Sequence, residues 1–315
     1  MPDPPQTSKR PPIESAPPRV HPPVRYAELH AKTNFSFLEG ASHADELALR
    51  AAEVGLAALA VTDRNTLAGI VRAHAAAKQL GLRLIVGAEI DLVDAPSVVL
   101  WTTDRASYGR LARLITQGRR QAPKGEFRLT FDELAAHAEG LLAGVLPHTR
   151  TNRERVPDDN THAHASESMA PQHLNRTPEL RIAAGDSLLN RQAELSSSLQ
   201  SPVSSLARFR ELFGDRCYLV GQLWKGPDDR AELDELLALS KRARLPLVAA
   251  GDVHYHARAR LALQDVLTAI RLHTTVAEAG DALFPNAERY LKSPEEMAER
   301  FAAAPGAVAR TLEIA

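Results

Sequence analysis

Short apolar runs alternate with helix-forming segments along most of this chain, and this alternation constrains the fold more than any other feature. The runs are bounded by glycine or polar residues, as buried strands usually are. The stretches between them have helical spacing of apolar residues, and Ser42 has the position of a cap for a helix expected over 44–54. Strands connected in this way are parallel and form an open doubly wound sheet or a closed β/α barrel. The expected strands begin at Tyr26, Leu59, Leu84, Val98, Leu141, Cys217 and Leu247.

The overall composition excludes several classes of protein. With 315 residues and 44% hydrophobic content, the chain can bury a sizeable core. The single cysteine, Cys217, excludes a disulfide framework and fits a reducing compartment, and no apolar run approaches the length of a membrane span. The formal charge of -1 gives no overall basic footprint of the kind typical of a free nucleic-acid binder. We therefore expect a cytoplasmic protein without a membrane partner.

Two segments depart from the alternation. Residues 1–24 are proline-rich and polar and lack the apolar core of a signal peptide, so a disordered leader is expected there. Residues 148–205 are rich in polar residues without a sustained period, which predicts a polar, disordered insertion. His162 and His164 in it have the spacing of two ligands for one metal, but nothing nearby would hold them rigid. The expected organisation is a barrel over 25–147 and 206–272, followed by connecting helices over 273–315.

Polar residues gather where the expected strands end, which is where parallel α/β folds bind ligands. Asp252 and His254 are two residues apart, so on an extended backbone they point to the same side. That arrangement suits two ligands of one metal or an acid orienting a histidine, while Asp252 acting only as a helix cap is the alternative. For Asp104 and for Gln222, a role as a cap or as a satisfied polar residue is the better explanation. The other residues at strand ends are His30, Lys32, Asp63, Arg64, Glu89, His148 and Trp224. As a set they predict a polar or formerly metal-binding pocket.

Several motifs resemble, in order and spacing, those of the PHP (polymerase and histidinol phosphatase) domain. They are residues 29–40 (LHAKTNFSFLEG), 61–69 (VTDRNTLAG), 87–89 (GAE) and 251–255 (GDVHY). Residues 263–270 (LQDVLTAI) and 284–297 (FPNAERYLKSPEEM) are similar, more narrowly, to the N-terminal part of the bacterial error-prone DNA polymerase family, which is related to the polymerase III alpha subunit. These two stretches are specific, because a stand-alone phosphatase has no need of them. The resemblance covers about 26–147 and 206–315.

The resemblance implies a distorted seven-stranded β/α barrel whose rim of histidines and carboxylates holds up to three divalent metals, such as Mn, Zn or Mg. In active members these metals support hydrolysis of a phosphoester. The sequence departs from the family motifs at four ligand positions, which hold Lys32, Arg64, Ser97 and Pro147. Cationic Lys32 and Arg64 would repel a divalent ion and can pair with the remaining carboxylates. We therefore predict a remnant site with no bound metal, no assigned catalytic residue and no robust phosphoesterase activity. The remaining ligand-type residues are His30, Glu39, Asp63, Glu89, Asp252 and His254.

The sequence is compatible with three functions. The leading one is a PHP-domain fragment of an error-prone polymerase, whose intact relatives are nucleotidyltransferases that perform translesion synthesis in the repair and replication of damaged DNA. The barrel would then pack against the polymerase body and reach DNA only through the intact enzyme. The resemblance also implies that the polymerase palm lies beyond the PHP domain, so this chain should not synthesise DNA alone. The alternatives are an independent metal-dependent phosphoesterase with a reduced site and a free interaction module for replication proteins.

Overall fold

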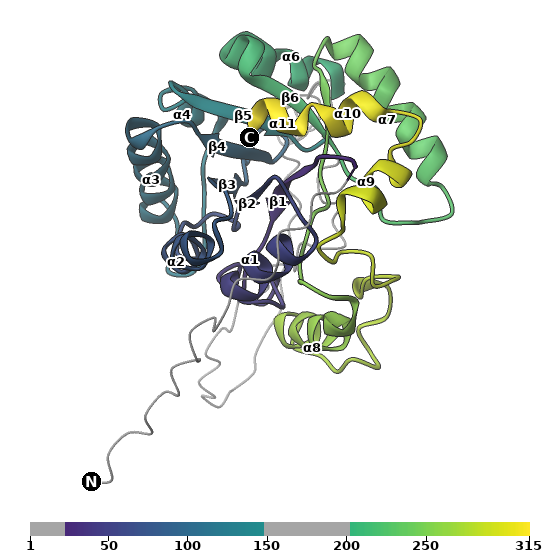
Figure 1. The fold of residues 1–315 in the computed structure, drawn as a ribbon. Helices are drawn as coiled ribbons and strands as arrows, with labels where there is room; N and C mark the ends of the chain where they lie inside the picture. The colour runs from purple at the N-terminus through teal and green to yellow at the C-terminus, as the bar shows by residue number, and fades with distance from the viewer. Residues whose placement is uncertain (1–22, 148–201) are drawn as a thin grey trace, which may run out of the picture.

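The computed structural model describes residues 23–147 and 202–315, in which seven strands form one sheet (Figure 1). The strands follow one another across the sheet in chain order, and each coincides with an apolar run identified in the sequence. They are β1 (Ala27–Ala31), β2 (Ala58–Val61), β3 (Leu84–Ile90), β4 (Val98–Thr102), β5 (Leu141–Val145), β6 (Cys217–Gly221) and β7 (Leu247–Ala249).

The direction of β4 contradicts the expectation that all strands are parallel. β4 runs antiparallel to both β3 and β5, whereas the other neighbouring pairs are parallel. The link between β3 and β4, residues 91–97, is too short for a parallel pair, which needs a crossover of about a dozen residues or more. Asp104, which follows β4, therefore lies at the opposite edge of the sheet from the residues that follow the other strands. It accepts a hydrogen bond from the Ser107 N–H at 2.7 Å and caps helix α3 (Arg105–Arg120).

The segment after β7 nearly closes the sheet into a barrel. Ala31 and Val253 form a parallel bridge. The Lys32 N–H donates to the Val253 carbonyl at 2.8 Å, and the Val253 N–H donates to the His30 carbonyl at 2.9 Å. The expected distorted seven-stranded β/α barrel is thus confirmed. The same bonds hold the residues on either side of Val253 against the end of β1.

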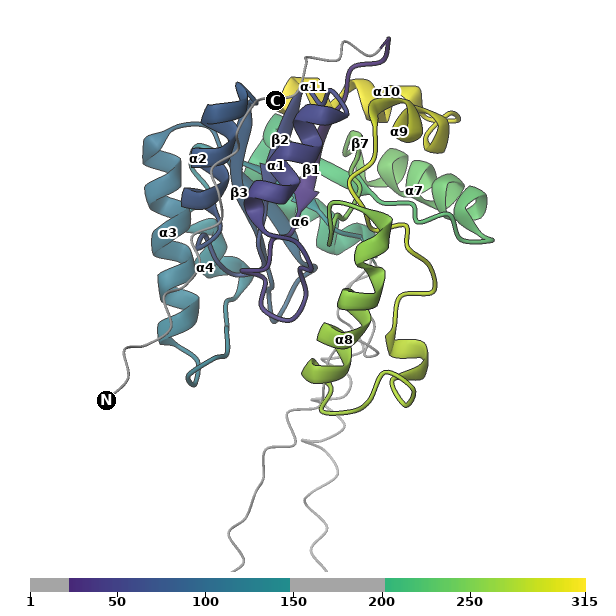
Figure 2. The ribbon, with the colours of Figure 1, turned by 60° about the horizontal axis from the view of Figure 1, so that its bottom comes forward.

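Helices cover the outside of this barrel (Figures 1 and 2). Helix α6 (Pro202–Phe213) begins inside the segment assigned above to the insertion, so residues 202–205 are helical; proline is well tolerated in a first helical turn. The rest of the expected leader and insertion, residues 1–22 and 148–201, lies outside the described residues. Within the described ranges, no helix is long and apolar enough to span a membrane. Besides α3, the helices are α1 (Ala44–Glu53), α2 (Ile70–Leu80), α4 (Phe131–Ala135), α6 (Pro202–Phe213), α7 (Asp229–Ala243), α8 (Leu261–Arg271), α9 (Pro294–Arg300), α10 (Pro305–Ala309) and α11 (Thr311–Ile314).

The inside of the barrel is a packed apolar core. Leu29, Val99 and Trp101 belong to one buried cluster with residues of the other strands. The Trp101 indole N–H donates to the Leu29 carbonyl at 2.8 Å, so its one polar atom is satisfied inside the barrel. A Cβ added at Gly144 would lie 2.3 Å from the Trp101 ring, which explains why glycine stands there. The strand ends above this core therefore stand on a filled interior.

The last helices cover the opposite end of the barrel. Ile314 of α11 belongs to the inner apolar cluster, and the Thr311 hydroxyl accepts a hydrogen bond from the Ala27 N–H at 3.1 Å, where β1 begins. Arg310 donates to the Leu247 carbonyl at the start of β7. These contacts leave the carboxyl ends of the parallel strands as the edge at which polar residues gather.

Candidate functional site

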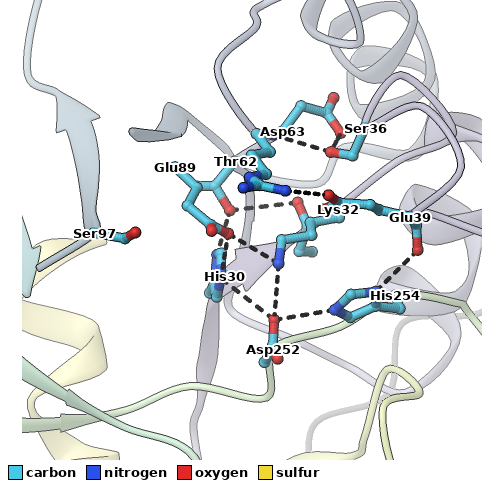
Figure 3. A network of polar contacts seen from close by, with 12 residues as sticks. His30, Lys32, Ser36, Glu39, Thr62, Asp63, Glu89, Ser97, Asp252 and His254 are labelled. Atoms are coloured by element: carbon cyan, nitrogen blue, oxygen red, sulfur yellow. Dashed lines mark hydrogen bonds and ion pairs between the residues drawn. The ribbon is translucent and has the colours of Figure 1, made fainter. Parts of the chain in front are cut away.

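Five polar residues from three strand ends meet at this edge (Figure 3). His30 and Lys32 stand at the end of β1, Glu89 lies near the end of β3, and Asp252 and His254 follow β7. All five are almost fully buried. Carboxyl ends of parallel strands share one edge of a sheet, so residues distant in sequence become neighbours. The sequence placed all five at strand ends, and the structure brings them into one cluster.

Lys32 lies at the centre of this cluster. Its Nζ is 2.9 Å from Glu89 Oε2 and 3.3 Å from Asp252 Oδ1. His30 Nε2 lies 3.2 Å from the same Glu89 oxygen and 3.4 Å from the same Asp252 oxygen. The ammonium group thus bridges two carboxylates in a position where a bound cation would otherwise do so. Removing one partner of such a group would leave a buried charge without compensation, which is costly in the interior.

The two histidines are oriented through their Nδ1 atoms. His30 Nδ1 is 2.8 Å from the Thr62 hydroxyl, and His254 Nδ1 is 2.9 Å from the Glu39 carbonyl, to which it must donate because a carbonyl only accepts. His254 Nε2 then faces Asp252 Oδ1 at 3.3 Å, a contact that is favourable when the ring carries both protons. Burial lowers the pKa of His30, and the proximity of Lys32 acts in the same direction. A hydrogen-bonded Nδ1 is also the usual arrangement of a metal-ligating histidine.

The backbone at Asp252 differs from the extended chain expected from the sequence. Asp252 has a φ of 47°, in the left-handed region that aspartate tolerates better than most residues. Asp252 and His254 nevertheless point into the same cluster, because the bridge at Val253 fixes the backbone between them. The alternative in which Asp252 only caps a helix is not what the structure shows, since its carboxylate contacts charged side chains.

Asp63 stands apart from the cluster and fastens the loop after β1. Its carboxylate accepts hydrogen bonds from the Thr33 N–H at 2.7 Å, the Thr33 hydroxyl at 2.8 Å and the Ser36 hydroxyl at 2.8 Å. Burial raises the pKa of Asp63, and these hydrogen bonds oppose that shift. The side chain therefore holds the loop that carries Glu39, and its lone pairs are already engaged.

Arg64 forms a second ion-paired group beside the first. Its Nη1 lies 2.5 Å from Glu39 Oε1, and its Nε lies 2.6 Å from Asp91 Oδ2. Asp91 also accepts hydrogen bonds from Asn65 Nδ2 at 2.9 Å and from the Ser97 hydroxyl at 2.9 Å. Ser97, at a position where the resemblance implies a ligand, therefore binds Asp91 and lies outside the central cluster (Figure 3). Pro147 follows β5 and offers no side-chain donor atom, and His148 lies outside the described residues.

Arg289 is a site residue that the sequence did not reveal. It forms an ion pair with Asp252 Oδ2, and its backbone carbonyl accepts from the His254 N–H at 2.8 Å. Its guanidinium carbon is 4.2 Å from the ring centroid of Trp224 and 4.2 Å from that of Phe284. Two aromatic faces thus hold the cation against the carboxylate. The one signal in the sequence was that Arg289 falls within the polymerase-like stretch 284–297.

The donor set does not fit the metals that the family implies. Glu89, Glu39 and Asp252 each have a cationic side chain as a close neighbour, and Asp63 is engaged by a loop. Within residues 23–147 and 202–315, no group of three or more His, Cys, Asp or Glu side chains is arranged to hold a metal ion. A divalent ion would have to displace Lys32 from between two carboxylates. The geometry shows a closed network of ion pairs at the place where ligands of such a fold bind.

Comparison with known proteins assigns the barrel to a class. Residues 28–164 match the PHP domain family, as the sequence motifs predicted. It is 41% identical over 292 residues to the error-prone DNA polymerase of Rhodopirellula baltica and 44% identical over 290 residues to that of Pseudomonas aeruginosa. These matches cover 93% and 92% of this chain but 22% and 23% of the relatives. The family resemblance found in the sequence is confirmed, and the chain spans less than a quarter of the length of these relatives.

Among solved structures, the likeness is distant. An amidohydrolase from Chromobacterium violaceum matches 73% of this chain and 87% of its own at 14% identity and a TM-score of 0.38. A lesion-specific endonuclease from Pyrococcus furiosus matches 73% of this chain and 48% of its own at 12% identity and a TM-score of 0.39. At these scores the likeness supports no assignment of function.

Proposed function

We propose that this chain is the PHP barrel of an error-prone, translesion DNA polymerase and that it is structural, with a degenerate metal site. The observation that carries this proposal is the bridging of Glu89 and Asp252 by the Lys32 ammonium at 2.9 and 3.3 Å. Arg64 and Arg289 neutralise Glu39 and Asp252 in the same way. The positive charge that the family draws from metal ions is supplied here by side chains.

The proposed partner of the barrel is a polymerase body. α8 supports this, because Leu263, Val266 and Ile270 form an exposed apolar stripe at positions i, i+3 and i+7, while polar Gln264 and Thr268 are buried. A helix with its apolar face turned outward is expected to bury that face against another protein surface. α8 is also one of the two stretches that resemble the polymerase family specifically. The chain alone, at under a quarter of the relatives' length, is not expected to transfer nucleotides.

The proposed location is the cytoplasm. Cys217 is a free, buried thiol, and burial raises its pKa to about 12, so it is poorly reactive. A protein whose one cysteine is unpaired suits a reducing compartment.

The site proposal is tested with the purified chain and a double variant, Lys32→His with Arg64→His, which replaces two of the three cations by ligand-type side chains. We expect the parent to bind neither manganese nor zinc at micromolar concentration and to leave bis-p-nitrophenyl phosphate intact, as measured by elemental analysis and absorbance. The double variant is expected to gain metal binding. Stoichiometric metal in the parent together with turnover of the phosphodiester would establish the phosphoesterase alternative instead.

The polymerase proposal is tested separately by sequencing the genomic DNA downstream of the coding sequence. A reading frame that continues into a polymerase palm, or resumes after a frameshift, is the expected result. A clean intergenic gap would favour an independent protein, either a phosphoesterase or a free interaction module. The result of the metal measurement then distinguishes between those two.

A further inference from the structure

Positive charge is concentrated in one part of this chain. Residues 105–128 contain seven Arg and Lys residues and one acidic residue, Glu126, a formal charge of +6 in a chain whose formal net charge is -1. Five of the seven lie on α3, which contains no Asp or Glu. The net charge of the whole chain does not reveal this concentration of positive charge, because the remaining residues carry an excess of negative charge. Such separation creates a local positive potential even in a protein that is nearly neutral overall.

Three of these arginines form a stripe along α3. With 3.6 residues per turn, Arg105, Arg113 and Arg120 fall within about 80° of the helix circumference, at intervals of about 12 and 10 Å along its axis. All three are exposed, and none forms an ion pair with a carboxylate anywhere in residues 23–147 and 202–315. We call these three residues the basic face.

The other two arginines of α3 have structural roles. Arg110 pairs with Glu139 at 2.7 Å. Arg119 donates to the carbonyls of Gly125 and Glu126 at 3.2 Å each, and also to the carbonyl of Asn65 at 3.2 Å. The two arginines that stabilise this region are thus different from the three of the basic face. Contacts within the folded chain therefore do not explain why the basic face is positively charged.

A shallow hollow adjoins the basic face. It has a volume of about 420 Å³ and is lined by Ala112, Arg113, Thr116, Gln117, Arg120 and Gln121. The acidic neighbour, Glu133, accepts hydrogen bonds from Gln117 at 3.0 Å, Gln121 at 2.6 Å and the Thr130 N–H at 2.8 Å. These donors, the Thr130 N–H first among them, lower the pKa of Glu133 to about 2. Hydrogen bonds therefore already stabilise the negative charge of Glu133. The guanidinium groups of Arg113 and Arg120 border the hollow.

The region beside α3 extends the positive field. α2 lies next to α3 in both views of the ribbon (Figures 1 and 2). Residues 65–88, which include α2, contain Arg72, Lys78 and Arg83 and no acidic residue. The bond from Arg119 to Asn65 ties the end of α3 to the loop that follows β2, at the edge of the barrel where the ion-paired cluster lies. The positive region thus runs along the outside of the barrel to that edge.

We propose that the basic face binds the phosphate backbone of DNA. Regularly spaced arginines on an exposed helix, with no carboxylate of the described residues paired to them, match a polyanion, and each Arg that neutralises a phosphate releases condensed counterions and so favours binding. Contacts of this kind position DNA without reading its sequence. This goes beyond the structural role proposed above, since it gives the barrel a DNA contact of its own and replaces the expectation that DNA is reached only through the rest of a polymerase.

The test is fluorescence anisotropy of a labelled oligonucleotide, single-stranded or double-stranded, titrated with the full chain at several KCl concentrations. The variant Arg113→Glu with Arg120→Glu is compared with Arg230→Glu with Arg242→Glu, which makes the same charge change at exposed positions of α7. We expect the parent and the α7 variant to bind both oligonucleotides independently of sequence. The α3 variant should bind at least about tenfold more weakly, and its slope of log affinity against log salt on double-stranded DNA should fall by about 1.8.

Thermal melting of both variants establishes that they are folded, and Arg113→Gln with Arg120→Gln repeats the test without adding negative charge. The proposal is overturned if the parent does not bind DNA at low salt. It is equally overturned if the α7 variant loses as much affinity as the α3 variant, because the effect would then reflect net charge alone. Neither outcome depends on whether the site at the strand ends binds metal.

Discussion

At the scale of single residues, the site is a set of carboxylates compensated by cations of different origin. Lys32 comes from the end of β1, Arg64 from the loop after β2, and Arg289 from the segment that follows α8. Lys32 is only 2% exposed, so its charge depends on its neighbours rather than on water. These side chains are consequently expected to matter for folding, although Lys32 and Arg64 stand at positions where the resemblance implies metal ligands.

The first prediction concerns Lys32. The substitution Lys32→Met leaves Glu89 and Asp252 buried beside one another without the ammonium group between them, and removing one partner of a buried pair costs about 3–5 kcal/mol. We expect urea unfolding to show a loss of that size. Lys124→Met, at an exposed position after α3, is the control and should change stability by less than about 0.5 kcal/mol. Equal stability of the two variants would mean that the buried charges are solvated in another way.

The second prediction concerns pH and Lys292. Burial lowers the pKa of the Lys292 ammonium to about 8 from its ordinary 10.5, so between these pH values the unfolded chain binds more protons than the folded chain. The contribution of Lys292 to the free energy of unfolding should therefore rise with pH over this window, and it should be lost as the pH falls back through 8. A shift of this size corresponds to about 3 kcal/mol. Lys292→Met should remove this rise, measured by urea unfolding at several pH values, whereas exposed Lys241→Met should retain it.

At the scale of elements, the positions of the strands were predictable because each apolar run is long enough to be buried and is bounded by polar or glycine residues. The direction of β4 was not predicted, since a run such as Val98–Thr102 has the same alternation whichever way it is paired. The short link before it was the available signal. Within the site, His30, Glu89, Asp252 and His254 could be placed at strand ends. Arg289 could not, because it reaches Asp252 through a contact between distant parts of the chain, and no local pattern encodes that contact.

The third prediction tests the packing of the strands. Gly144→Ala places a methyl group 2.3 Å from the Trp101 ring and 2.7 Å from a Val220 methyl, and such overpacking of a filled core usually costs about 1–3 kcal/mol. Gly109→Ala on α3 is the matched control, because a Cβ there meets no atom within 4 Å. It should stabilise the chain by up to about 1 kcal/mol through helix propensity. Thermal melting should therefore shift in opposite directions for the two variants.

At the scale of the whole molecule, three regions of the surface have distinct characters. One edge of the barrel holds the ion-paired cluster, the outside at α3 is basic, and α8 presents an apolar stripe. A free-standing protein gains nothing from an outward apolar stripe, which promotes aggregation. This distribution supports the proposal that the barrel works within a larger assembly.

The fourth prediction tests that requirement through α8. Leu263, Val266 and Ile270 are 40%, 44% and 52% exposed, so replacing all three by serine should leave the melting temperature of the chain almost unchanged. The same variant should lose its association with a polymerase body, assayed by co-purification with the remaining part of the Pseudomonas aeruginosa relative, because each apolar side chain loses its burial at the interface. Val71→Ser with Val93→Ser is the control, since these side chains are 79% and 55% exposed elsewhere on the barrel. Retained co-purification of the α8 variant would place the interface on another surface. A large fall in its melting temperature would show instead that the stripe stabilises the barrel itself.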